Sequence, residues 1–161
     1  MKEKMMDAMQ KFSKAMFVPV LILPIAGILI AIGNVFTNVR LIERFPFLDN
    51  PITTGFGSIL SASLLPILTN LGIIFCVGIA LGLAKKKKAE AAFTALLGYL
   101  VFLYAMNKFM ELRGMLVAAD ALQGSGQALV LGVQVLDMGV FLGIILGIIV
   151  ALIHNRFIDT T

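Results

Sequence analysis

Residues 133–157 read VQVLDMGVFLGIILGIIVALIHNRF, and this stretch decides the class of fold. An uninterrupted apolar run covers 138–153, and Asp137 precedes it as the expected helix N-cap, because a carboxylate there can accept hydrogen bonds from the first free N–H groups. Three glycines recur at every fourth position on one helical face: Gly139, Gly143 and Gly147. Lipid gives helices little hydrophobic reason to associate, so membrane helices pack closely on such small residues. We therefore predict a membrane-spanning helix near 137–154 with one face that contacts another helix.

The composition of the whole chain agrees with this class of protein. The 161 residues are 60% hydrophobic and 14% charged, with a mean hydropathy of +1.01. An ordinary soluble domain is about 45–50% apolar and about 25% charged, so this chain carries more apolar surface than one core of this size can bury. We predict an all-α integral membrane protein with about four transmembrane helices, surrounded by the lipid bilayer.

The amino-terminal region contains an expected interfacial helix and the first span. In residues 1–15, methionine and phenylalanine recur every three or four positions with lysines between them, which is typical of an amphipathic helix at the cytoplasmic interface; a plain positively charged flank is the alternative. Residues 16–36 exceed the roughly 20 that cross a bilayer. The run is too long for the apolar part of a cleaved signal peptide. Pro19 and Pro24 predict a bend near the cytoplasmic end of this span.

The second span, near 59–84, is the least regular. Its purely apolar part is short, so the span has to include Thr69 and Asn70, with Pro66 close by. We expect either a kinked helix or a short interfacial helix joined to a span. Asn70 either lines a polar path or, as is more common for one membrane asparagine, hydrogen-bonds a neighbouring helix.

A second pair of small residues, Gly78 and Gly82, follows in the same span. Their four-residue spacing makes them the expected partners of the glycine face in 137–154.

The third span, near 90–109, follows the four consecutive lysines Lys85–Lys88. We expect 110–134 to be a long outer segment, in which 124–126 (GSG) forms a flexible turn; it lacks the Gly-Lys-Ser/Thr ending of a phosphate-binding loop.

The distribution of basic residues orients the spans. Four lysines lie in the amino terminus, four in the loop at 85–88, and one arginine lies in the carboxyl tail. Each of the other two loops holds two lysines or arginines. Cytoplasmic loops carry the excess of basic residues, and an even number of spans then places both termini in the cytoplasm. The same clustering beside apolar runs argues against a nucleic-acid partner.

The residues supply little catalytic chemistry. His154 lies at a helix end, where a polar or positive group suits the helix dipole. Cys76 is the single cysteine and is expected to be a small buried residue. We find no cluster with metal-ligand spacing and no paired carboxylates in a span, so we assign no catalytic, substrate-binding or metal-binding residue and no cofactor.

Three segments, in order, resemble a known family. They are 9–34 (MQKFSKAMFVPVLILPIAGILIAIGN), 73–101 (IIFCVGIALGLAKKKKAEAAFTALLGYLV) and 131–157 (LGVQVLDMGVFLGIILGIIVALIHNRF). They are similar to the membrane component, enzyme IIC, of the sugar phosphotransferase system, in its glucose/maltose/α-glucoside superfamily. The leader and the tail 154–160 (HNRFIDT) look most like the maltose and α-glucoside members.

The resemblance implies a multi-pass permease of the bacterial cytoplasmic membrane, of which this chain is expected to be one half. In that family, further spans follow the tail and carry the sugar pocket, with its acidic residue and histidine. Residues 16–161 are therefore expected to correspond to the amino-terminal half, which forms most of the dimer contact. No catalytic or binding residue of the family can be placed here, because His154 matches the tail motif and not the active histidine.

The function that follows is sugar uptake coupled to phosphorylation, as part of a complete permease with a cytosolic IIB partner and a homodimeric assembly. The chain alone is expected neither to bind nor to transport sugar. Two alternatives stay open. One is a small four-span transporter or channel that uses Thr69 and Asn70; the other is a non-transporting protein that dimerises with a full-length permease through the glycine faces.

Overall fold

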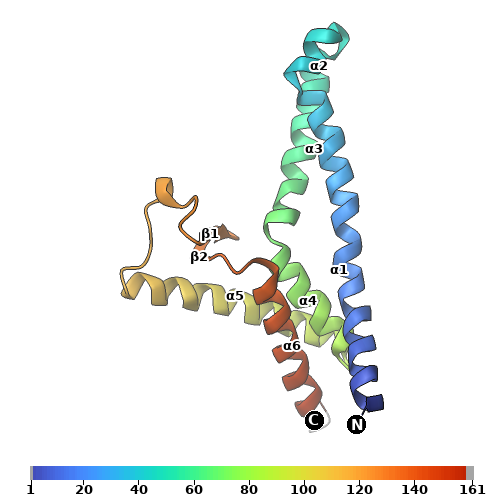
Figure 1. Cartoon of the computed structure of the whole chain (residues 1–161), viewed down its shortest axis with the longest axis vertical. Helices are drawn as coiled ribbons and strands as arrows, with labels where there is room; N and C mark the ends of the chain where they lie inside the picture. The colour runs from blue at the N-terminus through green and yellow to red at the C-terminus, as the bar shows by residue number, and fades with distance from the viewer. Residues whose placement is uncertain (1, 159–161) are drawn as a thin grey trace. The chain divides into compact units, whose positions relative to one another are not determined.

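The computed structural model describes residues 2–158 and is mostly helical (Figure 1). The elements in chain order are α1 (Lys2–Thr37), α2 (Val39–Arg44), η1 (Pro46–Leu48), α3 (Pro51–Thr69), α4 (Leu71–Leu83), α5 (Lys88–Leu112), η2 (Ala119–Ala121), β1 (Gln127–Val130), β2 (Val133–Leu136) and α6 (Gly139–Phe157). Four helical segments of the described chain are long and apolar enough to cross a membrane: Met9–Thr37, Pro51–Thr69, Lys88–Leu112 and Gly139–Phe157. The predicted all-α membrane fold with about four spans is confirmed, and the described chain also contains a small two-stranded sheet.

The first helix combines the two amino-terminal segments. Residues 2–37 form one continuous α-helix of 36 residues, so the amphipathic part and the first span follow each other without a break. An ion pair of 2.6 Å between Lys11 Nζ and Asp7, one turn apart, lies on the polar part of this helix. A helix of this length exceeds the roughly 20 residues that a bilayer requires, so its polar end can extend beyond the hydrocarbon.

The structure divides the expected second span at Asn70. Residues 51–69 form α3, which is itself a candidate span, and α4 follows as a separate helix of 13 residues. Pro66 has no N–H to donate to the preceding turn. One turn later, Thr69 Oγ1 donates to the carbonyl oxygens of Leu65 and Pro66, at 3.4 and 3.3 Å. These side-chain bonds and the non-helical backbone of Asn70 (ψ 31°) end α3.

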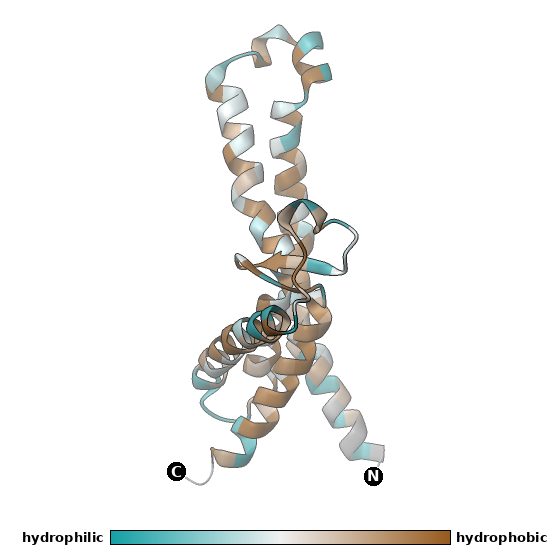
Figure 2. Ribbon diagram, turned by 90° about the vertical axis from the view of Figure 1, so that its left-hand side faces the viewer, coloured by the Kyte–Doolittle hydropathy of each residue, from teal (hydrophilic) through white to brown (hydrophobic). Residues whose placement is uncertain are grey.

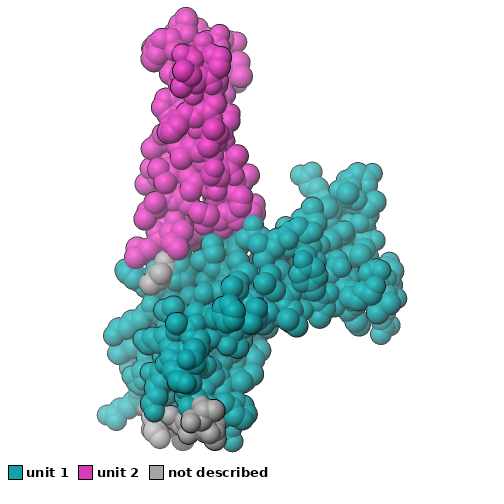
Figure 3. Space-filling model, turned by 180° about the vertical axis from the view of Figure 1, so that it is seen from behind, with its two compact units in different colours: residues 1–19, 70–161 teal, residues 20–69 magenta. Residues whose placement is uncertain are grey.

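The chain divides into two compact units, Met1–Pro19 with Asn70–Thr161, and Val20–Thr69 (Figure 3). In the second unit, α3 packs on the later part of α1 through Gly33 and Gly57. A Cβ at Gly57 would lie 2.6 Å from the carbonyl oxygen of Gly33. The rings of Phe36 and Phe56 meet edge to face, with centroids 6.0 Å apart. Small residues therefore allow these two helices to approach closely, as expected in lipid.

The core of the first unit lies where α4, α5 and α6 meet the β-hairpin. Its buried members are Cys76, Ala80, Ala95, Tyr99, Leu103, Val133, Val135 and Leu142. Alanine and cysteine come from α4 and α5, whereas the larger side chains come from α5, α6 and β2. The small residues allow the helices to approach closely, and the larger ones fill the space beside them.

The β-hairpin within the predicted outer segment was not expected from the sequence. Strands β1 and β2 are antiparallel, with Gln127 opposite Leu136 and Val130 opposite Val133. The two-residue turn contains Leu131 and Gly132, whose φ angles are +52° and +80°. Two successive positive φ values are typical of the tight turns that match strand twist.

The predicted helix start at Asp137 is wrong. Strand β2 extends to Leu136, and the backbone N–H of Asp137 donates to the carbonyl oxygen of Gly126 at 2.9 Å. Helix α6 begins at Gly139, with Met138 as N-cap residue and no side-chain cap. Strand pairing thus holds the backbone of Asp137 outside the helix.

Candidate functional site

The closest helix contact in the first unit lies between α4 and α6. A Cβ at Gly143 would overlap the carbonyl oxygen of Gly72, and a Cβ at Gly72 would lie 2.8 Å from the carbonyl oxygen of Gly139. One turn further along, a Cβ at Gly147 would lie 2.7 Å from the carbonyl oxygen of Cys76. The two backbones therefore touch directly, and the predicted glycine face of α6 does contact another helix.

The prediction that Gly78 and Gly82 contact this face is wrong. They lie on α4 as predicted, but a Cβ at Gly78 would meet Pro19 Cγ at 2.5 Å, and one at Gly82 would meet Ala15 Cα at 2.6 Å. Helix α4 thus presents small residues in two directions, one toward α6 and one toward the first part of α1. Four-residue spacing occurs on both faces, so spacing alone could not choose between them.

The carboxyl end of α6 binds the turn between α4 and α5. Asn155 Nδ2 donates to the carbonyl oxygen of Leu83 at 3.0 Å, and the backbone N–H of Lys85 donates to Asn155 Oδ1 at 2.8 Å. The last four carbonyls of a helix have no partner within the helix, and Leu83 is the final residue of α4. Asn155 therefore caps α4 from a neighbouring helix.

His154 adds a third bond at the same place. Its Nε2 lies 3.0 Å from the carbonyl oxygen of Lys86. A carbonyl oxygen only accepts, so Nε2 carries the proton in this contact. The sequence predicted that His154 lies at a helix end, and the structure confirms this. The sequence did not predict the contact of His154 with Lys86. We call His154 and Asn155 the tail clamp, and Lys85–Lys88 the lysine loop.

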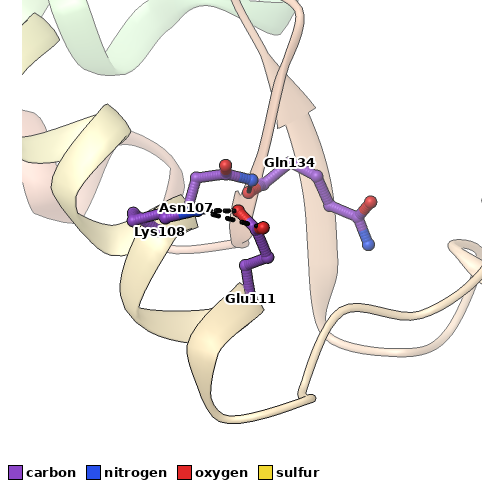
Figure 4. Close-up of polar contacts among 4 residues, drawn as sticks. All are labelled: Asn107, Lys108, Glu111 and Gln134. Atoms are coloured by element: carbon purple, nitrogen blue, oxygen red, sulfur yellow. Dashed lines mark hydrogen bonds and ion pairs between the residues drawn. The ribbon is translucent and has the colours of Figure 1, made fainter.

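A polar side chain of α5 joins this helix to the β-hairpin (Figure 4). Asn107 Nδ2 donates to the carbonyl oxygen of Gln134 at 2.7 Å, while Lys108 Nζ pairs with both carboxylate oxygens of Glu111 at 3.0 Å. Gln134 Nε2 in turn donates to Gln127 Oε1 at 2.8 Å. The third span was expected near 90–109, whereas α5 continues to Leu112, so Glu111 lies beyond the expected end.

Asn70 also binds the hairpin. Its Oδ1 accepts a hydrogen bond of 2.9 Å from the backbone N–H of Leu131, in the β-turn. Of the two alternatives for this residue, the structure shows a hydrogen bond to a neighbouring segment, although that segment is a turn and not a helix.

One polar contact that the sequence reasoning missed lies in the second unit. Ser61 Oγ donates to Asn34 Oδ1 at 3.1 Å and so joins α3 to α1. The sequence could have predicted this contact, because both polar residues lie in apolar helical runs, where polar side chains usually hydrogen-bond to a neighbouring helix.

These contacts connect helices and loops to one another. Among the side chains that the structure describes, none that is buried is charged, and no three His, Cys, Asp or Glu come together as metal ligands. The contacts described above therefore pack helices together and cap helix ends.

The fold and these contacts define a helical integral membrane protein assembled on glycine interfaces. Comparison with known protein families shows to which family this membrane protein belongs. The phosphotransferase system EIIC family matches residues 13–161, and the chain belongs to this family. It is thus a membrane component of a sugar phosphotransferase system permease, a class of protein that works with a IIB partner.

Proposed function

We propose that this chain belongs to a permease of the glucose, maltose or α-glucoside type. The support is the resemblance of the leader and of the tail 154–160 to the maltose and α-glucoside members. The tail clamp offers a physical reason for the His-Asn pair in that tail, since each side chain has its own backbone partner in the lysine loop.

We further propose that residues 16–161 act as the scaffold half of the permease, with the sugar pocket formed elsewhere. The observation that carries this proposal is how the polar side chains of the first unit are used. Asn70, Asn107 and Asn155 each bind the backbone of another segment, which is a structural use. The complete permease would take sugar from outside, alternate its access and present the sugar for phosphorylation by cytosolic IIB.

Sugar binding tests this division of roles. The purified chain in detergent is titrated with maltose, glucose and methyl α-glucoside in a calorimeter, and the expected result is no saturable heat. A chain co-expressed with the carboxyl-terminal half of a maltose-type permease is the matched sample, and it should bind one of these sugars. Saturable micromolar binding by the chain alone would contradict the scaffold role.

We propose a multi-pass location in the bacterial cytoplasmic membrane with both termini cytoplasmic, and a homodimer as the assembled state. Four candidate spans and the clusters of lysine at the amino terminus and the lysine loop support this orientation. Alkaline phosphatase fused after Phe157 should be inactive, whereas the same enzyme inserted at Ser125 should be active. Light scattering in detergent tests the dimer, and a monomer mass would contradict it.

A further inference from the structure

The lysine loop is held in a defined conformation. Three hydrogen bonds from the tail clamp fix the backbone at Leu83, the last residue of α4, and at Lys85 and Lys86 in the loop. Lys87 adopts a left-handed backbone conformation (φ 46°), which turns the chain into α5. The loop is therefore preorganised, so a ligand that binds it loses little entropy in ordering it.

Part of the positive charge of the lysine loop has no ion-pair partner among the described residues. Four lysines are consecutive, and Arg156 lies in the last turn of α6 beside Asn155. The carboxylate of Glu90 lies 3.7 Å from Lys87 Nζ. Lys85 and Lys88 are exposed and form no ion pair with any residue between 2 and 158. Like charges held close together repel, and a bound anion relieves that repulsion.

Exposed apolar side chains border the loop on all three helices. Leu81 on α4, Phe93 on α5 and Ile153 on α6 are 44%, 61% and 54% exposed, and each lies within six residues of the lysine loop or next to the tail clamp. In Figure 2 the ribbon of α6 is hydrophobic along most of its length and hydrophilic at its carboxyl end. A soluble anion would gain nothing from such a border, whereas a lipid can use both the charge and the apolar surface.

We propose that the lysine loop, held by the tail clamp, binds the phosphate headgroup of an anionic phospholipid whose acyl chains lie along the apolar ends of α4, α5 and α6. The loop thus does more than orient the spans: it forms a preorganised lipid site. This proposal does not depend on the sugar specificity or on the scaffold role.

Native mass spectrometry of the purified chain measures the site directly. The chain in detergent is mixed with equal amounts of phosphatidylglycerol and phosphatidylcholine with identical acyl chains, and the ratio of retained lipids is recorded. The wild type should retain the anionic lipid preferentially. The K85Q/K88Q variant should lower the ratio about 25-fold, because each lysine near a membrane surface contributes about a fivefold attraction.

Two further variants separate a built site from general attraction by charge. R40Q/R44Q removes the same charge from exposed positions in the second unit and should leave the ratio unchanged. Asn155→Leu keeps every charge but removes two bonds of the tail clamp, and it should lower the ratio several-fold. Equal losses in R40Q/R44Q and K85Q/K88Q, with no loss in Asn155→Leu, would overturn the proposal.

The remaining outcomes are equally informative. Excess inorganic phosphate should not displace the lipid, and displacement would show a site for free phosphate. An unchanged lipid ratio in K85Q/K88Q with lost binding of a IIB protein would assign the loop to a protein partner and overturn the lipid site. Folding is checked by the reactivity of buried Cys76 toward a maleimide. Where Asn155→Leu exposes this thiol, His154→Ala, which removes one bond only, replaces it.

Discussion

Replacement of Gly143 by alanine tests the contact on which the first unit is built. The added Cβ would overlap the carbonyl oxygen of Gly72 and would also lie 2.7 Å from its carbonyl carbon. Both obstacles are backbone atoms, so neither can rotate away as a side chain would. Helices α4 and α6 have to separate or shift along each other to accept the methyl group.

Gly98 in α5 provides the matched control. A Cβ there would meet Val150 Cγ2 at 3.7 Å, which is ordinary van der Waals contact. Gly143→Ala and Gly98→Ala both gain the roughly 0.5–1 kcal/mol by which alanine favours a helix over glycine. The difference between the two variants therefore isolates the overlap, and overpacking of this kind costs about 1–3 kcal/mol.

The single cysteine supplies the assay. Cys76 is fully buried in the core formed by α4, α5 and α6, so its reaction with a fluorogenic maleimide reports unfolding. Titration of the folded chain with a denaturing detergent gives the free energy of unfolding of each variant. We expect Gly143→Ala to be less stable than Gly98→Ala by about 1–3 kcal/mol. Equal stability within about 0.5 kcal/mol would refute direct backbone contact between α4 and α6.

Three further substitutions test the polar contacts. Asn155→Leu should destabilise the chain by about 1–3 kcal/mol because the Leu83 end of α4 loses its cap, and hydrogen exchange at the Lys85 amide should become faster; unchanged exchange would argue against the tail clamp. Asn107→Leu removes the 2.7 Å bond to the hairpin, so limited proteolysis within 110–134 should accelerate, and an unaltered cleavage rate would mean that the hairpin is held by other contacts. Ser61→Ala removes the 3.1 Å bond to α1, and its cost should be near the average of about 0.6 kcal/mol for such bonds in a membrane; a loss of several kcal/mol would show that the bond does more than join two helices.

The helices were largely predictable because their signals are local. Apolar runs of sufficient length identify spans wherever the chain places them, and Pro66 correctly indicated an irregular region. The hairpin was not predictable in the same way. Its strands have four residues each, and the turn places Leu131 at a positive φ that its side chain does not favour.

The candidate site was predictable only in part. The glycines of α6 indicated close helix packing, yet the choice of Gly72 over Gly78 as their partner depends on how α4 is rotated, and both faces of α4 carry small residues. His154 was placed at a helix end, and Asn155 was seen only as part of a motif. The sequence positions of His154 and Asn155 do not indicate which backbone carbonyl each side chain binds.

The sequence by itself determined that this is a helical membrane protein with about four spans, because hydropathy and run length belong to each segment separately. It also carried the motifs that identify the phosphotransferase system EIIC family, to which residues 13–161 belong. Only the tertiary structure decided that Asn155 binds Lys85 and that Asn70 binds Leu131. These partners lie 70 and 61 residues apart in the chain, and such contacts arise only once the helices have packed.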